Sequence, residues 1–277
     1  YNIPYIVSVR NTDLNLYLKY LIHLRTFGIE IIKNASRVIF TNHDYKNLFL
    51  KKYFPSKLND PLIFEVIPNG VDDFWIENTA KAKKYKNTSE LSVLYVGTFL
   101  KNKNVALLIQ TMFFLAKKKK EHKFTLNLVG GGGRGGIGKG DEKVYKKIDQ
   151  SIKIPNLSVN YHGRINDLET LKNLYIENDI FILISRKENF GLSFIEALSQ
   201  GTPILFTNGQ GVSSFFKNEI VGCGIDRFNS KEIISKINKI IENYNVMSAN
   251  AVLSTKRFGW NNIADKYDSI YKLFSKN

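Results

Sequence analysis

The chain has 277 residues, of which 43% are hydrophobic and 23% are charged, as is typical of a soluble globular protein with a buried core. Its single cysteine, Cys223, excludes a disulfide within the chain and fits a reducing compartment such as the cytoplasm. No apolar run approaches the roughly 18 residues that a membrane-spanning helix requires. The net charge of +15 favours an anionic partner such as a phosphorylated molecule, nucleic acid or anionic lipid, although a solvated lysine-rich surface is the plainer interpretation.

Short apolar segments alternate with helical patterns along the chain. The expected strands are dense in Val, Ile, Leu and Phe, as strands covered on both faces are: Tyr5–Val9, Arg37–Thr41, Phe64–Ile67, Leu91–Val96, Phe124–Val129, Leu157–Tyr161, Asp179–Ile184 and Pro203–Phe206. The expected helices are Leu14–Lys33, His43–Lys52, Val105–Lys118, Asp141–Ile152, Asp167–Glu177, Leu192–Gln200, Lys231–Tyr244 and Trp260–Phe274. This alternation predicts an α/β protein with parallel sheets and right-handed crossovers.

A polar segment with weak periodicity, residues 73–90, divides the chain and is typical of a linker. Residues 1–72 are too few for a complete doubly wound sheet, whereas residues 91–257 are enough for one. We therefore expect two α/β domains, the first of them incomplete. A chain that opens on Tyr1 and enters an apolar segment almost at once agrees with a missing beginning.

Ligands of such sheets bind beyond the carboxyl ends of the strands, so the loops that follow the strands are the candidate sites. After Val96 comes "GTFLKNKN", in which Gly97 permits a tight turn and Lys103 stands just before a helix. An ammonium group and free backbone amides at a helix start suit an anion. An ordinary surface lysine is the alternative.

The loop after Val129, "GGGGRGGIGKG", satisfies G-x-G-x-x-G and nearly satisfies a P-loop over Gly133–Lys139. A P-loop needs Ser or Thr at the next position to hold magnesium, and the residue there is Gly140. We therefore favour a flexible surface loop over a kinase or nucleotidase site. Only the first glycines, beginning with Gly130, stand at a strand end where a ligand would meet them.

The segment "SRKENFGLSFIEALSQGTPI" follows the strand that ends at Ile184. Gly191 lets backbone amides approach a ligand, and the helix that begins there directs its positive end at an anion such as a diphosphate. Glu188 before the helix and Glu196 within it are placed to accept hydrogen bonds from hydroxyl groups on either side. A diphosphate between two polyols is the outline of a nucleotide sugar. The alternative is an amphipathic helix with one solvent-facing acid.

The segment "ENFGLSFIEALSQGTPI" resembles the donor-site signature of retaining glycosyltransferases of the GT-B fold, family 4. The resemblance continues in the expected order through "VIPNGVD", "YVGTFLKNKNVALLI", "LNLVGGG", "VNYHGRI" and "LYIENDIFILIS". The last segment, residues 258–277, resembles the family's closing helix, which crosses back to the first domain. The resemblance implies two Rossmann-like domains and metal-independent transfer of a sugar, with retention, from a UDP- or GDP-sugar, without any other cofactor. The implied setting is bacterial surface polysaccharide or lipopolysaccharide assembly.

The resemblance also implies a role for individual residues. Glu188 would contact the hydroxyls of the transferred sugar, Lys103 would neutralise the leaving diphosphate, and Glu196 would hold the ribose. The other residues implied in donor binding are Gly97, Thr98, Gly130, Arg164, Ile165, Phe190, Gly191 and Leu192. Thr98 departs from the family, which usually has Arg there, so the leaving group would be stabilised by Lys103 alone or with Lys101 or Arg134 as a substitute. On the acceptor side, Arg10 stands where many relatives have His, and Asn11, Thr12 and Asp13 would line the cleft; a polar loop at a strand end is the alternative.

The acceptor cannot be identified from these patterns. The expected helix Leu14–Lys33 carries Lys19, His23 and Arg25 among apolar residues, so it would either lie on an anionic membrane or pack on its own sheet. A saccharide or lipid-linked saccharide acceptor is therefore expected, with the protein in the cytoplasm or on the inner face of the cell membrane. Nucleic acid is not expected, since no compact basic helix or aromatic RNA-binding signature is present. A chain that binds donor but transfers nothing remains an alternative.

Overall fold

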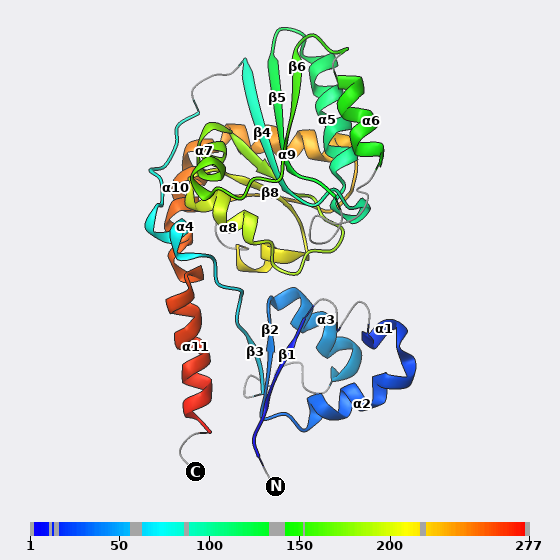
Figure 1. Cartoon of the computed structure of the whole chain (residues 1–277), viewed down its shortest axis with the longest axis vertical. Coiled ribbons are helices and arrows are strands. Elements are labelled where there is room, and N and C mark those ends of the chain that lie inside the picture. The colour runs from blue at the N-terminus through cyan, green and yellow to red at the C-terminus, as the bar shows by residue number, and fades with distance from the viewer. Residues whose placement is uncertain are drawn as a thin grey trace.

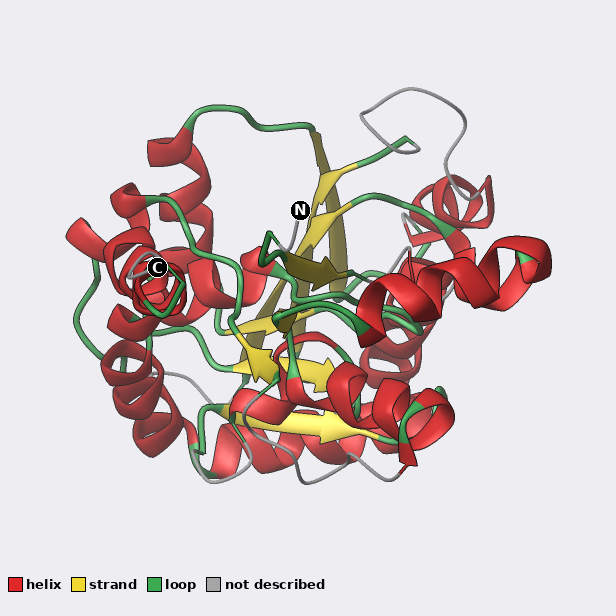
Figure 2. Cartoon of the chain, turned by 90° about the horizontal axis from the view of Figure 1, so that it is seen from below, coloured by secondary structure: helices red, strands yellow, loops and turns green. Residues whose placement is uncertain are grey.

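The computed structural model describes residues 3–10, 13, 17–55, 63–85, 89–132, 142–151, 153–216 and 220–274. Its strands form two parallel sheets, one of three strands and one of six (Figure 1). Helices cover both sides of the strands (Figure 2). The predicted α/β class and the parallel sheets are therefore confirmed.

The smaller sheet has the order β1-β2-β3, formed by Ile6–Val9, Arg37–Phe40 and Phe64–Val66. The helices α1 (Leu18–Tyr20) and α2 (Ile22–Lys33) lie between β1 and β2 in the sequence, and α3 (His43–Tyr53) lies between β2 and β3. The expected single helix over 14–33 is wrong as a continuous element, because Leu21 with ψ 70° leaves the helical region between α1 and α2. Residues 14–16 lie outside the described part of the chain.

The larger sheet has the order β6-β5-β4-β7-β8-β9. Its strands are β4 (Glu90–Gly97), β5 (Lys123–Gly130), β6 (Leu157–Gly163), β7 (Ile180–Ile182), β8 (Ile204–Thr207) and β9 (Gly222–Ile225). Its helices are α5 (Val105–Lys118), α6 (Glu142–Ser151), α7 (Leu168–Glu177), α8 (Leu192–Ser199), α9 (Ser230–Glu242) and α10 (Tyr244–Ser254). The strand order reverses between β4 and β7, and the crevice at such a reversal is where open α/β sheets bind ligands.

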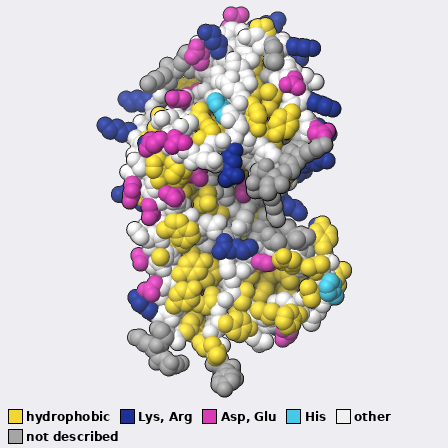
Figure 3. All heavy atoms as spheres, in the orientation of Figure 1, with side chains coloured by type: hydrophobic (Ala, Val, Ile, Leu, Met, Phe, Trp, Pro, Cys, Tyr) yellow, Lys and Arg dark blue, Asp and Glu magenta, His cyan; other side chains and the backbone are white. Residues whose placement is uncertain are grey.

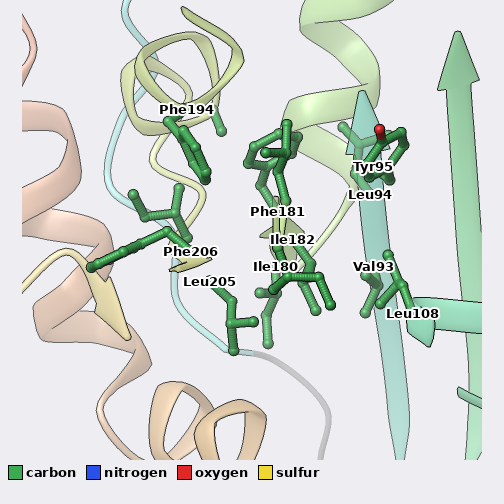
Figure 4. Packing of buried hydrophobic residues seen from close by; sticks show 14 of the residues in the cluster. Val93, Leu94, Tyr95, Leu108, Ile180, Phe181, Ile182, Phe194, Leu205 and Phe206 are labelled. Atoms are coloured by element: carbon green, nitrogen blue, oxygen red, sulfur yellow. The ribbon is translucent and has the colours of Figure 1, made fainter. Parts of the chain in front are cut away.

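Packing explains why α8 is so apolar. Phe194 of α8 stands edge-on to Phe181 of β7, with ring centroids 5.5 Å apart, and is 1% exposed (Figure 4). Leu94 of β4 and Leu205 of β8 are completely buried in the same core. The loop between β7 and α8 is therefore anchored at both ends, and it lies beside the loop after β4.

The described residues of the segment expected to be a linker, 73–85 and 89–90, include two that pack closely against the larger domain. The segment contains the helix α4 (Asp73–Glu77), in which Trp75 is 2% exposed and stands edge-on to Tyr175. Farther along, Lys83 Nζ donates hydrogen bonds to Tyr175 O, Asn178 O and Thr202 Oγ1 at 2.7–2.9 Å. The sequence did not predict α4, because a helix of five residues has too few turns to give a periodic pattern. The exact domain boundaries stay a prediction.

The last helix, α11 (Trp260–Lys272), returns to the smaller sheet (Figure 1). Its Ile263 and Ile270 form a buried cluster with Ile39 of β2 and with Ile67. The chain crosses between the sheets a second time beside it, where Val71 N donates to Phe258 O at 2.8 Å. Two crossing segments therefore join the sheets. Within the part of the chain that the structure describes, no helix combines the length and the apolar character needed to cross a membrane.

Candidate donor-binding site

The loops after β4 and β7 are bound to each other at the reversal of strand order. Arg186 N donates to Asn102 O, and Asn104 Nδ2 donates to Ile184 O, both at 2.8 Å. Asn104 adopts φ 55°, in the left-handed region, and thereby turns the short 3₁₀ helix Lys101–Lys103 into α5. The two loops therefore form one rigid edge beside the start of α8.

Lys103 and Glu188 meet at this edge. The Lys103 Nζ–Glu188 Oε2 distance is 2.7 Å, and the side chains are only 18% and 13% exposed. Ser185 Oγ donates to the same carboxylate oxygen at 3.3 Å. A partly buried pair of this kind is less screened by water than a surface ion pair. The structure thus brings together the two residues predicted to be catalytic.

Two glycines allow close packing of the chain around this edge. Gly191 adopts φ 82°, and a Cβ on it would lie 2.6 Å from Phe194 Cδ2. Gly130 lies opposite Gly97 at the ends of β5 and β4, and a Cβ on Gly130 would lie 1.9 Å from Gly97 O. Only glycine fits at these two positions without moving the backbone.

Glu196 lies in the second turn of α8 and is not the solvent-facing acid of the alternative interpretation. Tyr175 OH donates to Glu196 Oε2 at 2.8 Å. Burial raises the pKa of Glu196 to about 7, an effect that the hydrogen bond from Tyr175 opposes and the nearby Asp72 reinforces. The carboxylate thus changes charge near neutral pH, as groups in functional sites often do.

Three other residues predicted to bind the donor differ in which of their groups a ligand could reach. Phe190 is 1% exposed, and its ring lies in an aromatic cluster with Phe215 and Phe258, so only its backbone remains for a ligand. Leu192 is 39% exposed at the first turn of α8. The carbonyl of Thr98 accepts a hydrogen bond from Tyr95 OH at 2.7 Å, which fixes the turn after β4.

Arg164 and Ile165 follow β6, which is two strands away from β4 in the sheet. Arg164 is exposed and donates from Nε to Asn166 Oδ1 at 3.0 Å, whereas Ile165 packs partly against the core. They thus follow a strand that lies two places from β4, whose loop carries Lys103. Arg134 and the P-loop-like segment Gly133–Lys139 lie outside the described residues, and Lys101 is exposed.

On the acceptor side, Arg10 follows β1 and donates from Nη1 to Asn69 Oδ1 at 2.8 Å. Its backbone N–H donates to Asp13 Oδ2 at 2.7 Å, so these two residues form one turn. Asn11 and Thr12 lie outside the described residues. Among the described residues, no group of three or more His, Cys, Asp or Glu side chains is arranged to hold a metal ion.

Sequence patterns missed two contributors to the site, Gln210 and Tyr45. Gln210 Oε1 accepts from Glu188 N at 3.1 Å, and Tyr45 OH donates to Glu188 O at 2.9 Å. Both residues are distant from Glu188 in the sequence, and neither belongs to a motif. No local signal in the sequence could have placed them there.

The chain shares the GT-B fold with solved glycosyltransferase structures. Sucrose-phosphate synthase from Thermosynechococcus elongatus superposes with a TM-score of 0.72 at 21% identity, covering 98% of this chain and 68% of that one. The pneumococcal O-GlcNAc transferase in complex with UDP and GlcNAc gives 0.67 at 16% identity, covering 98% and 53%.

The chain belongs to the family of glycosyl transferases group 1, whose family model matches residues 76–254. An uncharacterized glycosyltransferase of Methanocaldococcus jannaschii is 24% identical over 99% of this chain and 70% of its own length. The lipopolysaccharide 1,2-N-acetylglucosaminetransferase of Salmonella typhimurium is 23% identical over 92% of this chain and 67% of its own length. The chain therefore spans about two thirds of these relatives.

Proposed function

We propose that this glycosyltransferase moves a sugar from a UDP- or GDP-sugar to an acceptor hydroxyl, with retention and without a metal ion. The observation that carries the proposal is the Lys103–Glu188 pair beside the start of α8, where the strand order reverses. A cation, free amides at a helix start and a nearby carboxylate match a sugar diphosphate, because each offers a partner to one part of that molecule.

Lys103 stabilises the leaving group in this proposal. Breaking the bond between the anomeric carbon and the phosphate oxygen leaves extra negative charge on the diphosphate. In this proposal the ammonium group of Lys103 and the amides of residues 190–192 receive that charge. The acceptor oxygen attacks from the same face, forms the new glycosidic bond, and passes its proton to the departing phosphate oxygen.

The two glutamates act on opposite sides of the diphosphate. Glu188 accepts hydrogen bonds from the hydroxyls of the transferred sugar, and Glu196 accepts them from the ribose. Tyr175 donates to only one oxygen of Glu196 in the structure, Oε2, and a carboxylate has capacity for further donors. Arg164 and Ile165 line the side of the base, because they follow the outer strand β6.

The proposed acceptor is a saccharide or a lipid-linked saccharide on the inner face of the cell membrane. A relative from Escherichia coli, 25% identical over 87% of this chain, is named for transfer to a diphosphoundecaprenol-linked sugar. In α2, Ile22, Leu24 and Phe27 are 50–68% exposed, and hydrophobic side chains gather over the lower part of the molecule (Figure 3). These side chains support peripheral contact with lipid, and a role in surface polysaccharide or lipopolysaccharide assembly.

The test measures donor hydrolysis and sugar transfer from UDP- and GDP-sugars, with and without a chelator, in the wild type, E188Q and the control E90Q. Glu90 is suitable as a control because its side chain is 58% exposed and far along β4 from the site. We expect E188Q to lower kcat by about a hundredfold or more, since an interaction with the reacting sugar is lost. Nucleoside diphosphate should bind E188Q at least as tightly, because Lys103 is released from its partner.

Three outcomes contradict the proposal. Transfer by E188Q at the normal rate refutes the role of Glu188. Loss of activity on chelation refutes the metal-free reaction and favours a magnesium-dependent P-loop-like enzyme. A wild-type protein that binds donor but neither hydrolyses nor transfers it is a donor-binding, inactive chain.

A further inference from the structure

We propose that the start of α3, in the half of the chain with the smaller sheet, is a clasp that positions Glu188 in the half with the larger sheet. Turnover would then depend on contact between these two halves. The clasp consists of residues 41–45, and it holds Glu188 and Asn189. The inference rests on the proposed function, since it assumes that Glu188 acts on the donor.

Three hydrogen bonds join the clasp to the loop before α8. Thr41 Oγ1 donates to Asn189 Oδ1 at 2.8 Å, Asn42 Nδ2 donates to Asn189 O at 2.6 Å, and Tyr45 OH donates to Glu188 O at 2.9 Å. The donors all come from the half of the chain with the smaller sheet, and the acceptors all belong to the loop that carries Glu188. The contact therefore depends on hydrogen bonds, with every donor on the clasp and every acceptor on the loop.

The same helix start makes a second contact farther along the larger domain. Ser213 Oγ donates to Asp44 Oδ2 at 2.8 Å, and His43 N donates to Ser214 Oγ at 3.2 Å. The His43 ring stands edge-on to Phe215, with centroids 5.5 Å apart. These contacts fix the orientation of α3, and so they fix the direction in which its first turn presents Tyr45.

The three donors of the clasp are buried, so their hydrogen bonds to the loop are needed for the interface to be stable. Thr41, Asn42 and Tyr45 are 2%, 0% and 4% exposed, although they lie between two domains. Buried polar groups cost free energy unless they are hydrogen-bonded, so this interface is stable only when the donors meet their acceptors. Burial, followed by the charge of Glu188, raises the pKa of Tyr45, which keeps its hydroxyl a donor.

Asn42 has two functions at once. Its Oδ1 accepts from Tyr45 N at 2.7 Å and caps α3, while its Nδ2 donates across to Asn189 O. The cap therefore fixes the amide orientation that the interdomain bond requires. Helix capping and domain docking are coupled in one side chain.

Glu188 is held at every polar group by its neighbours. Its N–H donates to Gln210 Oε1 at 3.1 Å, its carbonyl accepts from Gly211 N at 2.9 Å as well as from Tyr45, and its carboxylate meets Lys103. Tyr45 OH also lies 3.2 Å from Gln210 Oε1, but it has one proton, and the shorter contact is to Glu188 O. Tyr45 is a positioning residue, because it acts on the reacting sugar through Glu188. Displacing such a carboxylate by about 1 Å can lower a rate by about a hundredfold.

The test compares kcat and the donor Kd of the full chain for Y45F, N42D and the control Y53F. Y45F keeps the buried ring and removes the proton, whereas N42D keeps the α3 cap and replaces the donor to Asn189 O by a carboxylate oxygen. Tyr53 lies on the same helix, and its hydroxyl faces Leu18 O at 3.4 Å within the smaller domain. We expect kcat of Y45F and N42D to fall about tenfold or more, with donor Kd changed less than about twofold and Y53F like the wild type.

Two results would overturn the clasp. One is a kcat within about twofold of the wild type in both Y45F and N42D. The other is a loss of kcat that comes with an equal loss of donor affinity and a lowered melting temperature, and that Y53F reproduces, since general destabilisation would then explain it. An inactive wild type refutes the proposed function instead, and is seen before any variant is compared. If Y45F does not fold, T41V removes a different donor of the clasp and gives the same test.

Discussion

Replacing Glu196 by Gln should stabilise the protein at pH 8 and have little effect near pH 4.5. Burial raises the pKa of Glu196 from 4.5 to about 7, so the folded state holds this proton more tightly than the unfolded chain does. Between these two values the folded state binds more protons, so the contribution of Glu196 to stability is lost as pH rises through this window. The glutamine keeps an oxygen that can accept from Tyr175 OH, and it carries no charge.

The magnitude follows from the pKa difference. A shift from 4.5 to about 7 is worth on the order of 3 kcal/mol, taking about 1.4 kcal/mol for each pKa unit. This value is an upper bound, because Glu196 retains some exposure to solvent. The difference in unfolding free energy between E196Q and the wild type should therefore grow from near zero at pH 4.5 toward this bound at pH 8.

Urea unfolding of the wild type, E196Q and E169Q at a series of pH values measures that difference. Glu169 is the control, since its side chain is 58% exposed and pairs with Lys172 only three residues away on α7. All other titrating groups are shared, so subtraction isolates position 196. A difference that stays flat with pH, or that favours the wild type as pH rises, would refute the reasoning about burial. The same variant should bind nucleoside diphosphate more weakly than the wild type above pH 7, where the wild-type carboxylate is ionised.

Two further predictions concern the loops around the pair. K103A should lower kcat by about a hundredfold or more and weaken binding of nucleoside diphosphate, because the cation at the leaving group is lost; steady-state kinetics and calorimetry measure both, and unchanged binding would place the diphosphate elsewhere. G191A should lower the melting temperature and the activity together, because alanine at φ 82° is strained and its Cβ would lie 2.6 Å from Phe194 Cδ2; a melting curve like that of the wild type would show that the loop can move aside.

Local patterns predicted the parts of the fold that local interactions determine. The strands β4 and β5 and the helix α5 were predicted because their apolar content is continuous. Glu188 and Lys103 were predicted to be site residues because each lies in a loop that follows a predicted strand. β9 escaped prediction because Gly222–Ile225, "GCGI", is short and half glycine. α10 escaped because it follows α9 almost directly, and its apolar residues do not gather on one face.

Tertiary contacts determine what the sequence could not reveal about the site. The polar segment at 73–90 has few apolar residues, yet Trp75 and Lys83 fix it to the larger sheet through groups that are distant in sequence. Tyr45 reaches Glu188 across 143 positions, and Gln210 reaches it across 22. The motif drew attention to Glu188, whereas the residues that hold Glu188 in place come from other parts of the chain.

The pairing of Lys103 with Glu188 also bears on Thr98, which stands where the resemblance leads one to expect Arg. Lys103 is already neutralised by Glu188 in the structure, so a diphosphate that binds Lys103 must compete with the carboxylate. In the proposed reaction, this competition releases Glu188 from Lys103 at the moment when sugar hydroxyls arrive to replace the ammonium group. Binding of the diphosphate to Lys103 would thus free the Glu188 carboxylate to bind the sugar of the same donor. The clasp keeps the backbone of Glu188 in place during the exchange, because its bonds are to the carbonyl of Glu188 and to Asn189, and leave the carboxylate free to change partners.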